Sequence, residues 1–287
     1  MDVRSRYSFE PFADMREYKE EANRSAIRNL ASQLVLPNQG WMVLDVATGV
    51  GTIIELLWQE LLSRLNKGTI MGVDLASGAL ALAASRLKEA APDLVRGVAQ
   101  RLPLQEGSAH LVTAGNMIHN LTLEDKKRSL QEAFRVLKPG GVFWFNTTFY
   151  LGAVPEGSAS RVNIGTVATA VRLIQEMRPP VVRRKEARPE ARTWLSVDAY
   201  RELAAEAGFA VRSAVEHTVK VYVETWKAIN GYSEYAAGAL HGYPVDVACE
   251  VLPKAAEIAM GQHGLVDEVG TRYMPRRWLE ITAVKPG

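Results

Sequence analysis

The amino-acid sequence predicts an α/β protein whose core is a mostly parallel sheet with helices on both faces. Short apolar stretches with the length of buried strands alternate with helical patterns between residues 41 and 150. One of these strands ends in an acid followed by two spaced glycines, in the stretch Val43-Leu-Asp-Val-Ala-Thr-Gly-Val-Gly-Thr52. The 287 residues, 47% of them hydrophobic, can bury a sizeable core. These observations favour a single domain, residues 1–287, with insertions over two separate domains.

The elements of the first half follow from their residue patterns. Residues 1–37 are expected to form a helical N-terminal cover, with a helix from about Met15 to Leu34. Residues 38–148 read as the core of the sheet, with strands at 41–46, 69–74, 94–98, 110–115 and 141–147. Thr122 and Asp125 fit a capping box, so we expect a helix that begins there, ends at Pro139 and has an inner face of Leu130, Ala133, Phe134 and Leu137.

The second half adds two insertions. Residues 149–195 leave the fifth strand and contain a helix near 163–177. In residues 196–287, Ser196 is expected to cap a helix that ends at Gly208, before strands at 209–217 and 278–284. The lid-like insertion between those strands, residues 219–276, is rich in aromatic residues: Tyr222, Trp226, Tyr232, Tyr235 and Tyr243. Ligands of open α/β sheets bind at the carboxyl ends of the strands, so we expect a ligand pocket there; each aromatic side chain, taken singly, has packing as its alternative role.

The turn after the first strand has the features of a ligand-binding turn. Gly49 and Gly51 can adopt positive φ and let a ligand approach the backbone, and the helix that follows presents its first amide groups to that ligand. A dinucleotide would bring an anionic pyrophosphate, which Asp45 would repel, and its pattern requires glycine where this chain has Thr52. Asp45 would instead attract a ligand that carries a cation and no phosphate.

Four ordered segments resemble the motifs of the class I S-adenosylmethionine-dependent methyltransferases, in the version of the ubiquinone/menaquinone C-methyltransferase-like group. They are Asp45-Val-Ala-Thr-Gly-Val-Gly51, Met71-Gly-Val-Asp74, Gly97-Val-Ala-Gln-Arg-Leu-Pro103 and Val136-Leu-Lys-Pro-Gly-Gly141. The resemblance covers residues 40–150 in detail. It implies a Rossmann-like, doubly wound sheet of seven strands, mostly parallel with the last strand antiparallel, together with the helical N-terminal cover and the insertions.

The same resemblance implies that the cofactor is S-adenosylmethionine. The residues expected to bind it are Asp45, Ala47, Thr48, Gly49, Gly51, Asp74, Leu75, Ala99, Gln100 and Asn116. Asp74 would hold both ribose hydroxyls. Position 98 departs from the family pattern, because Val98 stands where many relatives have an aspartate that accepts from the adenine amino group. That contact is then expected from Gln100 or from a backbone carbonyl.

His119 is the best candidate for a catalytic general base. Methyl transfer from a sulfonium depends mainly on alignment, but an acceptor with a high pKa still needs its proton removed. The loop 115–121 follows the fourth strand and faces the methyl group in the resembled fold; a structural histidine is the alternative reading of His119. His217 and His241 are weaker candidates, whereas His110 and His263, the latter in an expected loop, are interpreted as structural.

The composition limits the classes of partner and cofactor that we expect for this protein. A net charge of +2, from 34 basic and 32 acidic residues, provides no overall field for nucleic acid, and acids and prolines interrupt the basic run 178–192, which is interpreted as a solvated loop. The single cysteine, Cys249, excludes an internal disulfide and a cysteine metal cluster, and no metal site is predicted. No apolar run is long enough to span a bilayer and no signal peptide is evident, so we expect a cytoplasmic protein.

Two functions therefore stay open at this stage. The first is a methyltransferase acting on a small molecule, such as a secondary metabolite or a lipid-like or quinone-like compound. The second is a protein of the same fold that binds S-adenosylmethionine without methylating, as a scaffold or for another reaction. The intact acids and glycines favour the first. The sequence leaves open the acceptor, the methylated atom and a homodimer interface formed by the insertions.

Overall fold

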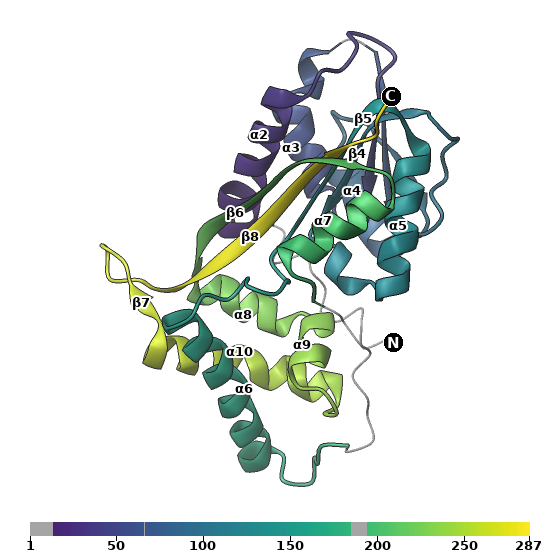
Figure 1. Cartoon of the computed structure of the whole chain (residues 1–287). Coiled ribbons are helices and arrows are strands. Elements are labelled where there is room, and N and C mark those ends of the chain that lie inside the picture. Colours follow the sequence, from purple (N-terminus) through teal and green to yellow (C-terminus); the bar gives the residue numbers. More distant parts are fainter. Residues whose placement is uncertain (1–13, 66, 185–193) are drawn as a thin grey trace. The chain divides into compact units, whose positions relative to one another are not determined.

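The computed structural model describes residues 14–65, 67–184 and 194–287. Its sheet has the strand order β3-β2-β1-β4-β5-β8-β6, with a short strand β7 paired to β8 (Figure 1). The bounds are β1 Met42–Val46, β2 Thr69–Asp74, β3 Asp93–Arg96, β4 Ala109–Gly115, β5 Leu137–Thr147, β6 Ala210–Tyr222, β7 Leu265–Val266 and β8 Arg272–Val284. Strands β1 to β5 pair in parallel and β8 runs antiparallel to β5, which confirms the predicted fold class.

The helices alternate with the strands through the first half and cluster in the second. Their bounds are η2 Glu17–Arg24, α2 Ser25–Gln33, α3 Thr52–Glu60, η3 Leu62–Arg64, α4 Ser77–Arg86, η4 Ile118–Asn120, α5 Leu123–Val136, α6 Ser158–Met177, α7 Val197–Glu206, α8 Val223–Gly231, α9 Ser233–Ala239 and α10 Val245–His263. Both predicted caps are present, because Thr122 accepts from the amide of Asp125 and Ser196 from that of Ala199.

The described residues group into two compact units. The sheet unit comprises 19–153, 194–217 and 278–287, and the helical unit comprises 14–18, 154–184 and 218–277. Most of the two predicted insertions, which lie far apart in the sequence, thus fold together in the helical unit. Across the described ranges, no helix is long and apolar enough to cross a membrane.

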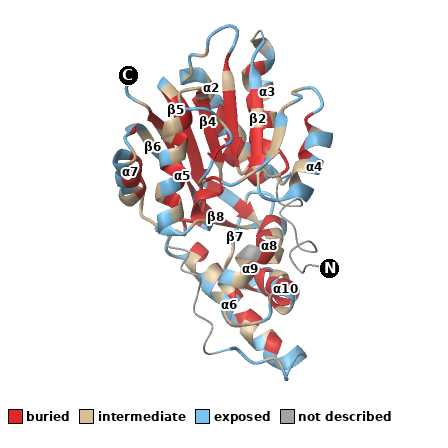
Figure 2. Cartoon of the chain, turned by 90° about the vertical axis from the view of Figure 1, so that its right-hand side faces the viewer, coloured by how far each residue is buried: buried red, intermediate tan, exposed pale blue. Residues whose placement is uncertain are grey.

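The central strands of the sheet unit are largely buried, as the red strands of Figure 2 show. Their apolar side chains belong to two clusters, one on each face of the sheet. Strand β5 shows the alternation: Phe143 and Phe145 pack with residues of α5 and α7, whereas Val142 and Trp144 pack with residues of α2 and α3. A strand covered on both faces reads as a continuous apolar run, which is why the central strands could be placed from the sequence.

The helical unit has a core of its own. Residues of α6, α9 and α10, among them Ala170, Ile174 and Leu252, form one buried cluster. In α8, Trp226 is fully buried and its indole Nε1 donates to Thr166 Oγ1 over 3.2 Å.

Several predicted boundaries were wrong. The sixth strand continues to Tyr222, because Val219 and Val221 are buried and alternate with exposed residues, so the insertion begins at 223 and not at 219. The final strand begins at Arg272 and not at Trp278.

Two further expectations also need correction. Helix α5 ends at Val136, and Leu137 opens β5 where the sequence suggested the last turn of a helix. His263 is the last residue of α10 and does not lie in a loop. The helix expected from about Met15 to Leu34 is present from Glu17 to Gln33, and its first part, to Arg24, is a π-helix. The expectation for residues 1–13 lies outside the described residues.

Candidate cofactor and acceptor site

The turn between β1 and α3 has the backbone geometry that the sequence predicted. Ala47 and Gly49 have φ of 54° and Gly51 has φ of 86°. A Cβ added at Gly49 would meet nothing within 4 Å, so a ligand can approach the backbone there. At Gly51 it would lie 2.4 Å from Leu87 Cδ1. The absence of a side chain at Gly51 therefore makes room for Leu87.

Asp45 is a buried acid beneath this turn. Its Oδ1 accepts from the hydroxyl of Thr113, 2.7 Å away on the neighbouring strand β4. Its Oδ2 is buried and has no hydrogen-bond partner among the described residues, and the same holds for the Thr48 hydroxyl. Burial raises the pKa of Asp45 to about 7, against the opposing effects of the nearby Thr113 and Thr48 hydroxyls. A buried carboxylate oxygen without a partner is costly unless a ligand supplies one.

Asp74 ends β2 and contacts the same turn. Its Oδ2 accepts from the amide of Gly49 and its Oδ1 from the amide of Ala76, both over 2.8 Å. An ionised carboxylate offers about four acceptor positions, so these two bonds fix its orientation and leave capacity for hydroxyl donors. Leu75, the next residue, is 63% exposed.

The segment after β3 is held by side chains of α5. Glu132 accepts from the amide of Leu102 over 2.8 Å, and Arg135 donates to the carbonyls of Leu102 and Leu104. Before this anchor, Val98 is 41% exposed, Ala99 is buried and Gln100 is half-buried. The three residues expected near the adenine thus lie on a segment whose far end is fixed.

Asn116 begins the loop after β4. It has φ of 49°, which asparagine tolerates better than most residues. Its amide donates to Asn146 Oδ1 over 2.9 Å, and its own Oδ1 accepts from the amide of Thr148 over 3.2 Å. The side chain of Asn116, predicted to bind cofactor, therefore also joins this loop to the end of β5.

His119 lies in η4 of the same loop and is buried. Its Nδ1 is 3.2 Å from Thr147 Oγ1, and its ring centroid is 4.3 Å from that of Phe149. The Thr147 hydroxyl also accepts from the amide of Phe149 over 3.0 Å. The imidazole is thus held between the end of β5 and the segment that follows it.

The other histidines have different surroundings. His110 accepts from the amide of Met42 and lies 3.1 Å from Lys138 Nζ, at the start of the strands. In the sheet unit, His217 Nδ1 is 3.0 Å from Glu280 Oε1, on a strand away from β4. In the helical unit, Arg183 donates to the backbone carbonyl of His241. The basic run expected as a solvated loop lies partly outside the described residues, at 185–193.

Sequence reasoning missed the residues that orient the predicted ones. Thr113 holds Asp45, Thr147 contacts His119, and Asn146 binds the amide of Asn116. These partners depend on strand register, which the sequence alone does not reveal. Lys126, buried next to the same loop, could have been noticed, because it stands four residues before Leu130 on the inner face of its helix.

Known proteins match the part of the chain that carries this geometry. Residues 44–145 match a family described as a methyltransferase domain. The chain is 35% identical over 123 residues to a ubiquinone/menaquinone biosynthesis C-methyltransferase of Legionella pneumophila, which covers 40% of this chain and 47% of the relative. The chain thus spans about half the length of the curated relatives it matches.

Two solved structures share the fold over most of the chain. The YcgJ protein of Bacillus subtilis is 15% identical, with a TM-score of 0.57, and 92% of this chain aligns with 98% of that one. The [4+2]-cyclase SpnF is 16% identical, with a TM-score of 0.51, and 91% of this chain aligns with 80% of that one.

Proposed function

We propose that the protein is an S-adenosylmethionine-dependent methyltransferase acting on a small-molecule acceptor, because residues 44–145 match a family described as a methyltransferase domain. The observation that carries the proposal is the buried Asp45 Oδ2, which lacks a partner among the described residues beneath a turn of positive φ. A cationic ligand placed there satisfies this oxygen.

The residues around the turn fit S-adenosylmethionine. Its cationic amino acid part complements Asp45, and the open backbone at Gly49 lets it approach. The remaining acceptor capacity of Asp74 suits the two ribose hydroxyls, since both of its oxygens are already oriented by backbone amides. A nicotinamide dinucleotide would bring its pyrophosphate to the same turn, where Asp45 opposes it.

In the proposed reaction, the bound S-adenosylmethionine supplies a methyl group on a positively charged sulfur. The protein holds the acceptor in line with that methyl group and excludes water. His119 is the proposed general base, because it lies in the loop that follows β4, and Thr147 and Phe149 hold its ring. A positioned base contributes roughly 10²- to 10⁴-fold to such a step.

The acceptor is proposed to be a small aromatic or lipid-like compound of the quinone class. The Legionella relative is named for methylating carbon in ubiquinone and menaquinone biosynthesis. The family match ends at residue 145, before residues 154–184 and 218–277 of the helical unit. We assign acceptor selectivity to that unit, because loops and insertions at the carboxyl ends of the strands are where such folds vary.

Turnover of labelled S-adenosylmethionine tests this proposal. The purified protein is supplied with a panel of naphthoquinols, phenols and amines, and formation of S-adenosylhomocysteine is followed for each. We expect turnover with at least one quinol or phenol, and a loss of roughly 10²-fold or more in His119→Asn with little change in cofactor affinity. Binding of the cofactor without turnover on any acceptor would contradict the proposed activity.

A second function is supported by one comparison. The SpnF structure is named a [4+2]-cyclase, and it shares this fold at a TM-score of 0.51. A protein of this architecture can therefore serve a reaction other than methylation. The same assay separates the two functions, because a non-methylating protein would bind S-adenosylmethionine and leave it intact.

A further inference from the structure

Lys126 stands out among the residues on the inner face of α5. The buried residues of this helix are Lys126, Ser129, Leu130, Ala133 and Val136, which recur at helical spacing and face the sheet. The last four pack against the strands or are small. Lys126 is fully buried although lysine is almost never so without a charged partner.

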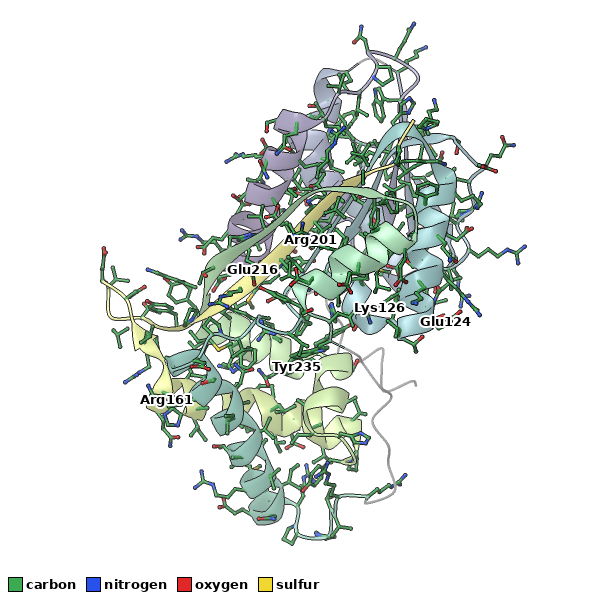
Figure 3. The ribbon with its side chains drawn as sticks, in the orientation of Figure 1. Glu124, Lys126, Arg161, Arg201, Glu216 and Tyr235 are labelled. Atoms are coloured by element: carbon green, nitrogen blue, oxygen red, sulfur yellow. The ribbon has the colours of Figure 1, made fainter. Side chains whose placement is uncertain are left out.

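Lys126 lies at the same edge of the sheet as the candidate site described above. Helix α5 connects the carboxyl end of β4 to the start of β5, so its first turn lies at the carboxyl edge of the sheet. Figure 3 shows Lys126 at this end of the helix. Its ammonium donates to the carbonyl oxygen of Leu121, two residues after His119. Lys126 and the proposed base therefore belong to one short stretch of chain.

One hydrogen bond does not satisfy this ammonium. It has three N–H donors, and Leu121 O is its one hydrogen-bond acceptor within the described part of the chain. Asp125 is the acidic neighbour, but its carboxylate oxygen accepts from the Thr122 hydroxyl in the helix cap. Burial lowers the pKa of Lys126 to about 8, which still leaves it mostly charged at neutral pH. A buried cation with donors to spare is suited to bind an anion.

We propose that Lys126 binds the anionic oxygen of the methyl acceptor, so that the acceptor class is an enol or phenol methylated as its enolate or phenolate. This inference rests on the proposed function and narrows it to oxygen or carbon as the methylated atom. An amine acceptor would place its own positive charge beside a buried ammonium, which is unfavourable at short range.

The proposed methyl transfer uses the acceptor hydroxyl, His119, Lys126 and the methyl group on sulfur. The acceptor hydroxyl gives its proton to His119, and the resulting oxyanion is paired with Lys126. The enolate or phenolate then uses one electron pair to form a bond to the methyl carbon. The bond between that carbon and sulfur breaks, and its electrons stay on sulfur, which becomes neutral. Methylation at carbon leaves a dienone, which loses its ring proton to water and becomes the methylated enolate or phenolate. The protonated His119 then returns its proton to that oxygen, which restores the enol or phenol and the free base.

Binding of a matched pair of probes tests the role of Lys126. Lawsone is a hydroxynaphthoquinone that is ionised at neutral pH, and its methyl ether is uncharged and of similar shape. Both are titrated into the protein loaded with S-adenosylhomocysteine, for wild type, Lys126→Met and Lys126→Arg. Lys127→Met is the control, because it removes the same charge from a neighbouring side chain that is 43% exposed and paired with Glu206.

We expect Lys126→Met to weaken lawsone binding about ten- to hundredfold, the range for a charged hydrogen bond, and to leave the methyl ether unaffected. Lys126→Arg should recover part of the loss, and Lys127→Met should match wild type. Equal loss for both probes would mean that Lys126 only supports the loop, and unchanged lawsone binding would overturn the inference outright. Failure of the proposed function is seen separately in wild type, as absence of S-adenosylhomocysteine binding or as absence of turnover with every acceptor of the panel.

Discussion

The sheet unit and the helical unit differ in how their residues come together. In the sheet unit, Asp45, Asp74 and the loop of His119 each follow or end a strand, so topology alone gathers them at one edge. The helical unit is assembled from segments separated by many residues, and its core forms between α6, α9 and α10. The strand ends bring the candidate cofactor residues together by topology, whereas the helical unit depends on packing between segments that are far apart in the sequence.

Trp226→Ala is expected to give the largest effect on the stability of one unit without an effect on ligand binding by the other. Trp226 is fully buried in the helical unit, contacts Tyr235 edge to face and donates to Thr166. Its removal should lower the free energy of unfolding of that unit by about 3–5 kcal/mol. Binding of S-adenosylhomocysteine should change by no more than about twofold, since the candidate cofactor residues belong to the other unit.

Urea unfolding and calorimetric titration of Trp226→Ala measure these two quantities. Trp226→Phe is the control, because it keeps a ring in place and should cost less. A parallel collapse of cofactor affinity in Trp226→Ala would show that the two units do not act separately.

The next largest effect is the pH dependence that Asp45 imposes on the cofactor-free protein. Its pKa is raised from an ordinary 3.8 to about 7 by burial, so the unfolded chain releases this proton at lower pH than the folded one. The free energy of unfolding should therefore fall as pH rises from about 4 to about 7, by on the order of 4 kcal/mol from this group.

Asp45→Asn should remove that pH dependence, since it has no proton to release. Urea unfolding of both proteins across this pH range provides the measurement. The same variant should bind S-adenosylmethionine more weakly, because the charge that complements the ligand is lost. Identical pH slopes for wild type and variant would refute the assignment.

The strands and helices of the sheet unit could be predicted because residues at their ends carry recognisable signals. An apolar run that ends in Asp45 or Asp74 marks a strand end, and Thr122 and Ser196 mark helix starts. The limits of β6 and β8 could not be read in the same way. One face of β6 is exposed, and only two valines near its end are buried. In the sequence this stretch of mixed polarity looks like a loop, so the continuation of the strand could not be predicted.

The candidate site was predictable to a similar degree. The acids and glycines of the turn carry a local signal, and His119 stands out as a histidine after a strand. Thr113 and Thr147 carry none, because a threonine in a strand is ordinary until the register places it beside an acid or an imidazole. The contact between Gly51 and Leu87 could not be predicted, because Leu87 lies 36 residues away in the sequence.

The two glycines of the turn offer a matched pair. Gly51→Ala should cost about 2–4 kcal/mol of unfolding free energy, because it combines a positive φ with overlap on Leu87. Gly49→Ala meets only the backbone strain and should cost about 1 kcal/mol, while reducing cofactor affinity. Thermal unfolding with S-adenosylhomocysteine titration distinguishes them, and equal destabilisation by both changes would contradict the packing role of Gly51.

A smaller effect is expected from Asp74→Ala. Loss of its bonds to the ribose hydroxyls should weaken cofactor binding by about 1.5–3 kcal/mol. Asp74→Asn keeps an acceptor oxygen for the Gly49 amide and should lose less. Calorimetric titration gives both affinities, and an unchanged affinity in a folded Asp74→Ala protein would show that this carboxylate serves the turn alone.

The most direct test of the cofactor site is calorimetric binding of S-adenosylmethionine, S-adenosylhomocysteine and NADH to the purified protein. The buried, unpartnered oxygen of Asp45 and the open backbone at Gly49 predict binding of the first two and not of NADH. Binding of NADH, or of none of the three, would contradict the assignment of the turn to a cationic, phosphate-free cofactor.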